Sequence, residues 1–264
     1  MFNRRKHIGL DSGFNSSPLA QRRTSGGFTP AELNPVLWLE TGNDNYTLDG
    51  SGNISNWTAS IGTSLDQTVV LDRPSPQTLS GASFVLFEET TLEHLNMNNT
   101  YQSMYRGSFT KYFIFKPNVI GTSSRFLFGH LDSTQTKLVY VMINTNGTFT
   151  VWLRNGVLGT LVKAKTVEVL STANTYIVEI NHDIVNKQIN IYINGVLAAL
   201  DGIENGDTTA INMTTYTNPV PLFMNARNFN GSDGLYGDNS FGDVLFFDKL
   251  LTPTQRTSLG NYYV

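Results

Sequence analysis

The sequence contains no cysteine, so neither disulfide bonds nor thiolate metal sites can stabilise the chain. Charged residues are scarce, at 15%, whereas hydrophobic residues make up 40%, which excludes the highly charged, weakly hydrophobic composition typical of disorder. No run approaches the ~18 consecutive apolar residues that a membrane-spanning helix needs. We therefore expect a folded domain that is stabilised by burial and has no contact with a membrane.

The motifs of several enzyme classes are also missing. No Gly-x-Ser-x-Gly nucleophile elbow occurs, and the four histidines lie far apart with no metal-ligand spacing. Glycosidases on β-sandwiches place two acids on one face of a strand, but Glu88 and Glu89 are adjacent and would point to opposite faces. The sequence therefore predicts no catalytic residue, no cofactor and no enzymatic activity.

The first residues of the chain carry an unusual charge. Residues 1–26 contain five basic side chains, Arg4, Arg5, Lys6, Arg22 and Arg23, against one acidic residue, a net charge of 5 − 1 = +4. The rest of the chain carries 13 basic and 20 acidic residues, so its net charge is −7. Residues 1–27 lack apolar periodicity, which is typical of an extended arm. We expect this arm to anchor the protein to an assembly through its five cations, with contacts to nucleic-acid phosphates and a disordered end as the alternatives.

The charged start also resembles that of a signal peptide, but the apolar stretch that should follow is absent, so secretion by that route is not expected.

Residues 28–264 show the pattern of an all-β domain. Ten short runs rich in Val, Ile, Phe and Tyr predict strands. They span residues 36–40, 83–87, 109–116, 125–131, 138–144, 148–154, 175–181, 188–194, 221–225 and 241–247. Ten strands are too many for one open sheet, so we expect a two-sheet antiparallel sandwich.

Turn and helix signals fit the sandwich. Asn-Gly pairs at 146–147, 155–156 and 194–195 lie between apolar runs and favour tight hairpin turns. Residues 29–32 predict one helical turn at the start of the domain. Residues 252–255, which combine a threonine cap, a proline and a glutamine, predict one short C-terminal helix.

The motifs follow one another in a family-like order. They are Asn-Pro-Val-Leu-Trp-Leu-Glu at 34–40 with residues 49–57, the strand at 108–117, residues 176–180 with the Tyr-Ile-Asn-Gly turn at 192–195, and residues 241–247 with Leu-Leu-Thr-Pro at 250–253. From about Leu33 to Val264 this order resembles the laminin G-like jelly rolls of the concanavalin A-like superfamily. The resemblance implies the fold, but proteins of this fold include lectins, adhesins and virion proteins.

Together with the arm, the resemblance suggests a non-enzymatic structural or adhesive protein. Our first expectation is a bacteriophage virion component, a head fibre, decoration or tail-adhesin subunit. Its arm would bind other virion proteins, its jelly roll would be exposed, and it would form a homo-oligomer. The alternative is a carbohydrate-binding or adhesion module of a bacterial surface protein. In either case host-surface glycans are possible partners.

Two kinds of binding site were considered within the domain. Trp152, Tyr140, Tyr192 and Tyr236 have the chemistry to stack on sugars, although strand aromatics more often serve packing. Residues 49–53 and the loop aspartates Asp233, Asp238 and Asp243 are oxygen-rich candidates for calcium. Because Asp, Asn and Gly are also what tight turns require, we favour a turn role for them and predict no metal site.

Overall fold

The computed structural model describes residues 27–41, 45–97, 105–121, 123–131, 134, 136–156, 161–204, 222–229 and 232–263. For residues 202–204, 228, 229 and 232–234 it describes the backbone only. Apart from Gly27, the predicted arm and its five cations lie outside these residues. Among the described residues, no helix combines the length and the apolar character needed to cross a membrane.

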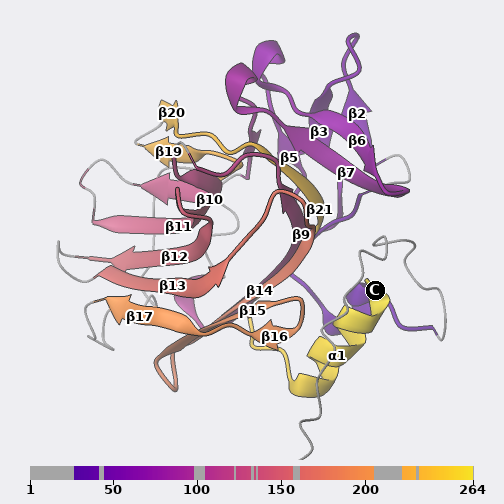
Figure 1. Ribbon diagram of the computed structural model, residues 1–264. Helices are drawn as coiled ribbons and strands as arrows, with labels where there is room; N and C mark the ends of the chain where they lie inside the picture. Colours follow the sequence, from indigo (N-terminus) through magenta and orange to yellow (C-terminus); the bar gives the residue numbers. More distant parts are fainter. Residues whose placement is uncertain are drawn as a thin grey trace, which may run out of the picture.

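Two sheets stack as the layers of a β-sandwich, as predicted (Figure 1). One has nine strands, and its main order is β16-β15-β14-β9-β21-β1-β4, with β7 pairing with β21 and β6 with β7. Its strands are β16 (Val196–Leu197), β15 (Gln188–Ile193), β14 (Tyr176–Asp183), β9 (Phe109–Pro117), β21 (Asn239–Phe247), β1 (Leu37–Leu39), β4 (Ala59–Ile61), β7 (Ala82–Phe87) and β6 (Ser75–Leu79).

The other sheet has twelve strands in the order β17-β13-β12-β11-β10-β18-β8-β5-β3-β2, with β19 and β20 beside β10. They are β17 (Leu200–Glu204), β13 (Leu161–Val169), β12 (Thr148–Asn155), β11 (Lys137–Ile143), β10 (Arg125–Leu131), β18 (Phe223–Met224), β8 (Leu95–Asn96), β5 (Leu65–Asp66), β3 (Ile54–Trp57), β2 (Tyr46–Leu48), β19 (Arg227–Phe229) and β20 (Ser232–Gly234). Each of the ten predicted strands overlaps an observed one.

Three short 3-10 helices and one α-helix complete the described structure. They are η1 (Pro30–Leu33), η2 (Val70–Asp72), η3 (Glu89–Thr91) and α1 (Pro253–Tyr262). The α-helix begins with the predicted capping box, in which the Thr252 hydroxyl accepts a hydrogen bond from the Gln255 amide at 3.2 Å. Both predicted helix starts are therefore confirmed.

The main core lies between the two sheets. In β15 the residues Ile189, Ile191 and Ile193 are buried and alternate with Asn190 and Tyr192, as the sequence predicts for a strand with one buried face. The turn after β15 is also as predicted, because Asn194 and Gly195 both have positive φ, 52° and 79°.

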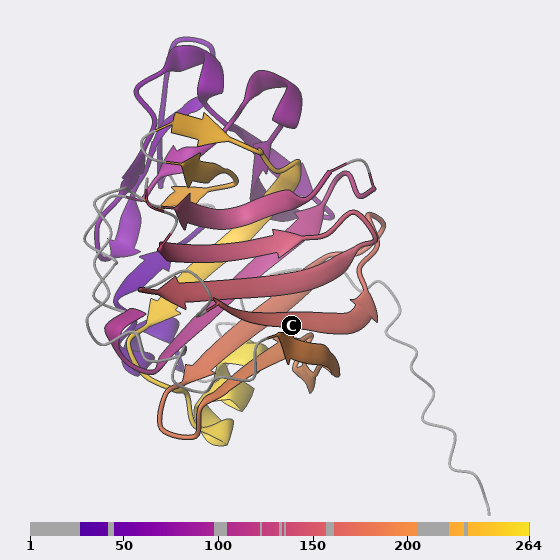
Figure 2. The same cartoon turned by 90° about the vertical axis from the view of Figure 1, so that its left-hand side faces the viewer.

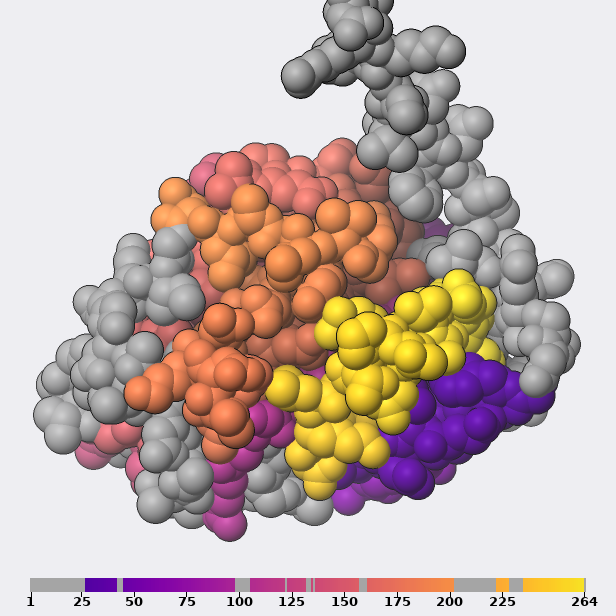
Figure 3. Space-filling model, turned by 90° about the horizontal axis from the view of Figure 1, so that it is seen from below, coloured from indigo at the N-terminus to yellow at the C-terminus, as the bar shows by residue number. Residues whose placement is uncertain are grey.

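A second apolar layer covers the outer face of the nine-stranded sheet. Helix α1 packs there beside η1, and Phe28 meets Tyr262 edge to face at 6.3 Å. Figure 3 shows the yellow helix lying against the indigo start of the described domain. Trp38 belongs to this layer, whereas Trp57 lies in the main core, so both tryptophans are buried.

A lysine lies in the main core. Lys111 shares the inward side of β9 with Phe109 and Phe113 and is 1% exposed. Its ammonium nitrogen lies 4.6, 5.0 and 4.7 Å from the ring centres of Tyr105, Phe128 and Phe246 and has no hydrogen-bond partner among the described residues. Burial lowers the pKa of this amine well below its usual value.

Candidate functional site

The outer face of the twelve-stranded sheet carries a row of large side chains. Neighbouring strands pair Gly129 with Tyr140, Tyr140 with Trp152, and Trp152 with Lys163, so the row crosses β10, β11, β12 and β13. Alternation places these residues opposite the buried Val139, Val141 and Leu153 that face the core. Figure 2 shows this sheet in front, with the diagonal strands of the other sheet behind it.

Stacked rings and a cation make up the centre of the row. The rings of Tyr140 and Trp152 lie 6.0 Å apart, and Phe126 meets Tyr140 edge to face at 4.9 Å. The ammonium of Lys163 lies 5.0 Å from the centre of the Trp152 ring. Trp152 is partly exposed, whereas Tyr140 and Phe126 are buried, so the indole is the ring that a ligand can reach.

Gly129 explains how an arginine reaches this row. A side chain at position 129 would lie 3.1 Å from the Ala226 carbonyl oxygen and 3.2 Å from the Arg227 Cα. Because glycine occupies the position, residues 226–227 can cross the sheet there. Arg227 then lies beside Phe126, with its guanidinium carbon 5.9 Å from the ring centre.

The pKa of the Tyr140 hydroxyl reflects the charges on this face of the sheet. Burial raises the pKa of its hydroxyl above the usual value, and the positive charges of Arg227 and Arg154 oppose that shift. Arg154 follows Trp152 by two residues on β12 and therefore points to the same side of the sheet. The Trp152 indole N–H is buried and has no hydrogen-bond partner among the described residues. We call Tyr140, Trp152, Arg154, Lys163 and Arg227 the aromatic–basic face.

The structure brings together two of the four aromatic residues that were considered for sugar stacking. Tyr140 and Trp152 are neighbours, whereas Tyr192 lies on the nine-stranded sheet under the guanidinium of Arg256, 4.1 Å from its ring. Tyr236 lies elsewhere, in a cluster with His94 and Phe223. Sequence reasoning did not select Arg154, Lys163 or Arg227. The alternation of residues 161–165 could have indicated Lys163, but only the register relates it to Trp152.

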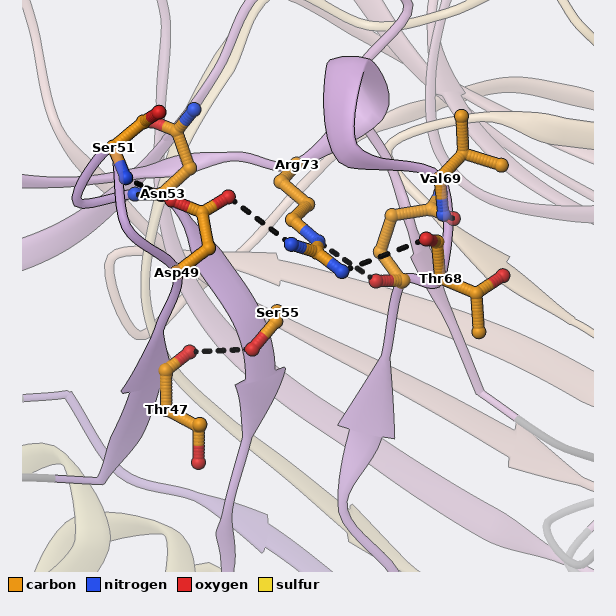
Figure 4. Close-up of polar contacts among 9 residues, drawn as sticks. Thr47, Asp49, Ser51, Asn53, Ser55, Thr68, Val69 and Arg73 are labelled. Atoms are coloured by element: carbon orange, nitrogen blue, oxygen red, sulfur yellow. Dashed lines mark hydrogen bonds and ion pairs between the residues drawn. The ribbon is translucent and has the colours of Figure 1, made fainter.

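The loop at 49–53, which was considered for calcium and assigned a turn role, uses the Asp49 carboxylate to stabilise the fold (Figure 4). One oxygen of Asp49 accepts hydrogen bonds from the backbone amides of Ser51 and Asn53, at 2.8 and 3.0 Å. The other accepts from Arg73 at 3.1 Å. These contacts, led by the Asn53 amide, hold the pKa of Asp49 below its usual value.

Asp243, another of the predicted oxygen donors, is buried in a hydrogen-bond network. Its carboxylate accepts from the Thr41 amide and hydroxyl, both at 2.8 Å, from the Tyr263 hydroxyl at 2.9 Å and from the Trp38 indole at 3.3 Å. Across the described ranges, no group of three His, Cys, Asp or Glu side chains is arranged to hold a metal ion. His130 and His182 are buried strand residues.

Glu93 lies in a second polar cluster, two residues after the end of η3. Its carboxylate accepts a hydrogen bond from the Glu88 amide at 2.7 Å. Burial raises its pKa to about 7, and the charges of Glu88 and Asp238 act in the same direction. Its neighbour His94 stacks on Phe223 with ring centres 4.5 Å apart.

The raised pKa predicts a pH-dependent stability. In the unfolded chain this carboxyl has a pKa near 4.5, whereas burial raises the pKa of folded Glu93 to about 7. Its contribution is therefore fully present below about pH 4.5 and is lost as the pH rises to 7. As the pH rises over this interval, we expect the free energy of unfolding of the wild type to fall by about 1 to 2 kcal/mol relative to that of Glu93→Gln, after allowance for solvent screening. Urea denaturation at pH 4.5 and 8 measures it, and parallel pH profiles for the two proteins would contradict the assignment.

The chain is similar to known proteins in its fold and not in its sequence. No family model matches the chain, and no curated protein matches its sequence. Among solved structures, the chain is similar to the Trypanosoma rangeli sialidase in complex with the inhibitor DANA, with a TM-score of 0.53 and 10% identity over 86% of this chain. The match covers 32% of the sialidase, so the chain spans about a third of that protein.

Two further solved structures match less closely. The Ruminococcus gnavus IT-sialidase CBM40 has a TM-score of 0.49 and 14% identity, over 60% of this chain and 84% of that one. The binding domain of botulinum neurotoxin DC in complex with rat synaptotagmin II has a TM-score of 0.49 and 16% identity, over 87% and 52%. Together with the observed strand order, the sialidase match supports one conclusion: the fold is an antiparallel β-sandwich of the jelly-roll kind.

Proposed function

We propose that the protein is a non-enzymatic carbohydrate-binding or adhesion module whose ligand lies on the aromatic–basic face. The observation that carries this proposal is the cross-strand row of Tyr140, Trp152 and Lys163 on an outward-facing sheet. A partly exposed indole offers an apolar platform for the C–H face of a sugar ring.

The residues of this face are suited to binding a glycan without hydrolysing it. Glycosidic hydrolysis needs two carboxyl groups on either side of the scissile bond. The charged residues of the aromatic–basic face are all basic, and the described carboxylate of Asp201, which acts on Lys163, is held in an ion pair with Lys165. We therefore expect no release of reducing ends when polysaccharides are incubated with the protein.

Trp152→Ala is the direct test. We expect it to weaken glycan binding about 10- to 100-fold, because an aromatic contact of this size contributes about 1.5 to 3 kcal/mol. Binding to a broad glycan panel, followed by titration calorimetry on the best ligand, measures the loss. Tyr192→Ala removes an aromatic side chain from the other sheet and serves as the matched control, with no expected effect on binding. Unchanged affinity in a folded Trp152→Ala protein would exclude this face.

A second proposal concerns location and rests on the charge of residues 1–26, +4 against −7 for the rest of the chain. We propose that the protein is a bacteriophage virion component, a head fibre, decoration or tail-adhesin subunit, whose arm binds an acidic surface of another virion protein. Arg4, Arg5, Lys6, Arg22 and Arg23 would supply the attraction, and the sandwich would present the aromatic–basic face outward. Such attraction weakens as salt rises.

Deletion of residues 1–27 tests the arm. We expect the truncated protein to keep its melting temperature, because the arm offers the core no periodic apolar face, and to be absent from purified particles. Replacing the five cations by serine should reduce incorporation into particles at low salt. The reduction should be smaller at high salt, because salt already screens the attraction there. Incorporation of the truncated protein at normal copy number would contradict the anchor and leave the sandwich as a free binding module.

A further inference from the structure

We propose that Lys163 is a displaceable cover on the Trp152 ring, and that a glycan binds by moving the Lys163 ammonium off the indole towards Asp201. This inference rests on the proposed function and adds how the binding face is regulated. It is carried by the contact between the ammonium and the indole, on the side of the ring that is turned towards β13.

The indole of Trp152 is flanked from both sides. Its cross-strand partners are Tyr140 on β11 and Lys163 on β13, so the two side chains approach it from opposite sides of β12. The ring centre of Tyr140 lies 6.0 Å from that of the indole, and the buried Tyr140 ring is packed in turn against Phe126 at 4.9 Å. Because Tyr140 cannot move aside without breaking this packing, the β11 side of the indole is closed to a ligand.

The β13 side of the indole is covered by a group that can move. The Lys163 ammonium lies 5.0 Å from the centre of the indole ring, and the lysine side chain is partly exposed. A cation–π contact at an exposed site shifts an equilibrium only about two- to fivefold. A sugar ring that stacks on the indole needs the position above the ring that the ammonium occupies. Stacking of a sugar therefore requires the ammonium to leave.

Strand β17 offers the displaced ammonium a second position. Lys163 is paired with Glu204 across the β13–β17 ladder, and Asp201 precedes Glu204 on the same strand. The Asp201 carboxylate forms an ion pair with Lys165, and its side chain is 55% exposed, which leaves room for a second cation. The pKa of Asp201 is lowered first by Lys165, and the charge of Lys163 acts in the same direction. Lys163 can therefore exchange its contact with the ring for one with a carboxylate.

Fluorescence quenching tests the cover without any glycan. The chain has three tryptophans, and Trp38 and Trp57 are buried, so quenching by acrylamide reports mainly on Trp152. We expect Lys163→Ala to raise the quenching constant about twofold or more, because the ammonium no longer shields the ring. Lys116→Ala removes a lysine from β9 of the other sheet and is the matched control, with no expected effect. Equal quenching of the wild type and Lys163→Ala would overturn the cover.

Glycan binding tests the exchange. The probes are the neutral polymers dextran, galactan and β-glucan, titrated by calorimetry. We expect Lys163→Ala to bind its best probe about two- to fivefold more tightly than the wild type, because the ligand no longer has to displace the ammonium. Asp201→Asn removes the second position and should weaken binding about twofold. The same substitution in a Lys163→Ala background should have no effect, since the two residues act as a pair.

The outcomes separate the cover from the proposed function. Weaker binding by Lys163→Ala would mean that the lysine holds the ligand, which overturns the cover and leaves the binding face. An effect of Asp201→Asn that persists in the Lys163→Ala background would overturn Asp201 as the second position. If no glycan binds, or if Trp152→Ala changes nothing, the proposed function is wrong and the exchange with it, whereas quenching still decides whether Lys163 covers the indole. Circular-dichroism melting of each variant confirms that it is folded.

Discussion

Ile191→Asp is expected to abolish the cooperative unfolding transition of the sandwich. Ile191 is fully buried in β15 and pairs with Ile180 of β14, also buried, inside the main core. An aspartate there would place an unpaired carboxylate among aliphatic side chains, or would have to take up a proton to avoid this. The cost of several kcal/mol is comparable with the whole stability of a domain, about 5 to 15 kcal/mol.

Val185→Asp provides the comparison. Val185 lies in the turn between β14 and β15 and is 81% exposed, so the same substitution there should change the melting temperature little. Differential scanning calorimetry of both variants gives the result. A cooperative melt of Ile191→Asp at the wild-type midpoint would mean that this side of β15 does not face the core.

The second large effect is expected at Asp243. Asp243→Ala leaves the buried donors of Trp38, Thr41 and Tyr263 without the carboxylate that accepts from them. Because each buried, unsatisfied donor costs about 1 to 3 kcal/mol, we expect a total loss of about 3 to 5 kcal/mol after partial relaxation. The loss should appear as a lower urea midpoint with an unchanged slope.

Smaller changes at the same network should cost less. Asp243→Asn keeps one acceptor oxygen, and Tyr263→Phe removes a single hydrogen bond, so each should lose only part of the stability lost by the alanine variant. The network joins the segment after β1 to the residue that follows α1. A wild-type urea midpoint for Asp243→Ala would show that the attachment of these two segments to one another does not depend on the Asp243 carboxylate.

Local patterns in the sequence were sufficient to predict the fold class. The alternating isoleucines of residues 189–193 and the caps at Thr29 and Thr252 each specify an element through neighbouring residues, and the structure contains each element. Strand β13 was missed although residues 161–165 alternate clearly, because its outward positions are lysines, which are depleted in strands. Strands β5 and β8, each of two residues, are too short for any period to appear.

The candidate site could be predicted only in part. Tyr140 and Trp152 were selected by residue type, but nothing local indicates that they are paired across two strands, since pairing depends on register. The position of Arg227 is even harder to predict from the sequence, because it depends on Gly129, nearly a hundred residues earlier in the chain. The role of Asp243 was missed for the same reason: two of its partners, Trp38 and Thr41, lie about two hundred residues away.

The amine of Lys111 makes the interior of the sandwich chemically distinguishable from its surface. In the closed sandwich, the three surrounding rings keep acylating reagents away from an amine whose basicity is already suppressed. Exposure of that nitrogen requires the two sheets to separate, so the rate at which Lys111 is acylated would follow global opening rather than fraying at the edges. Acylation of Lys111, the amine in the hydrophobic core, would therefore report the global opening of the fold.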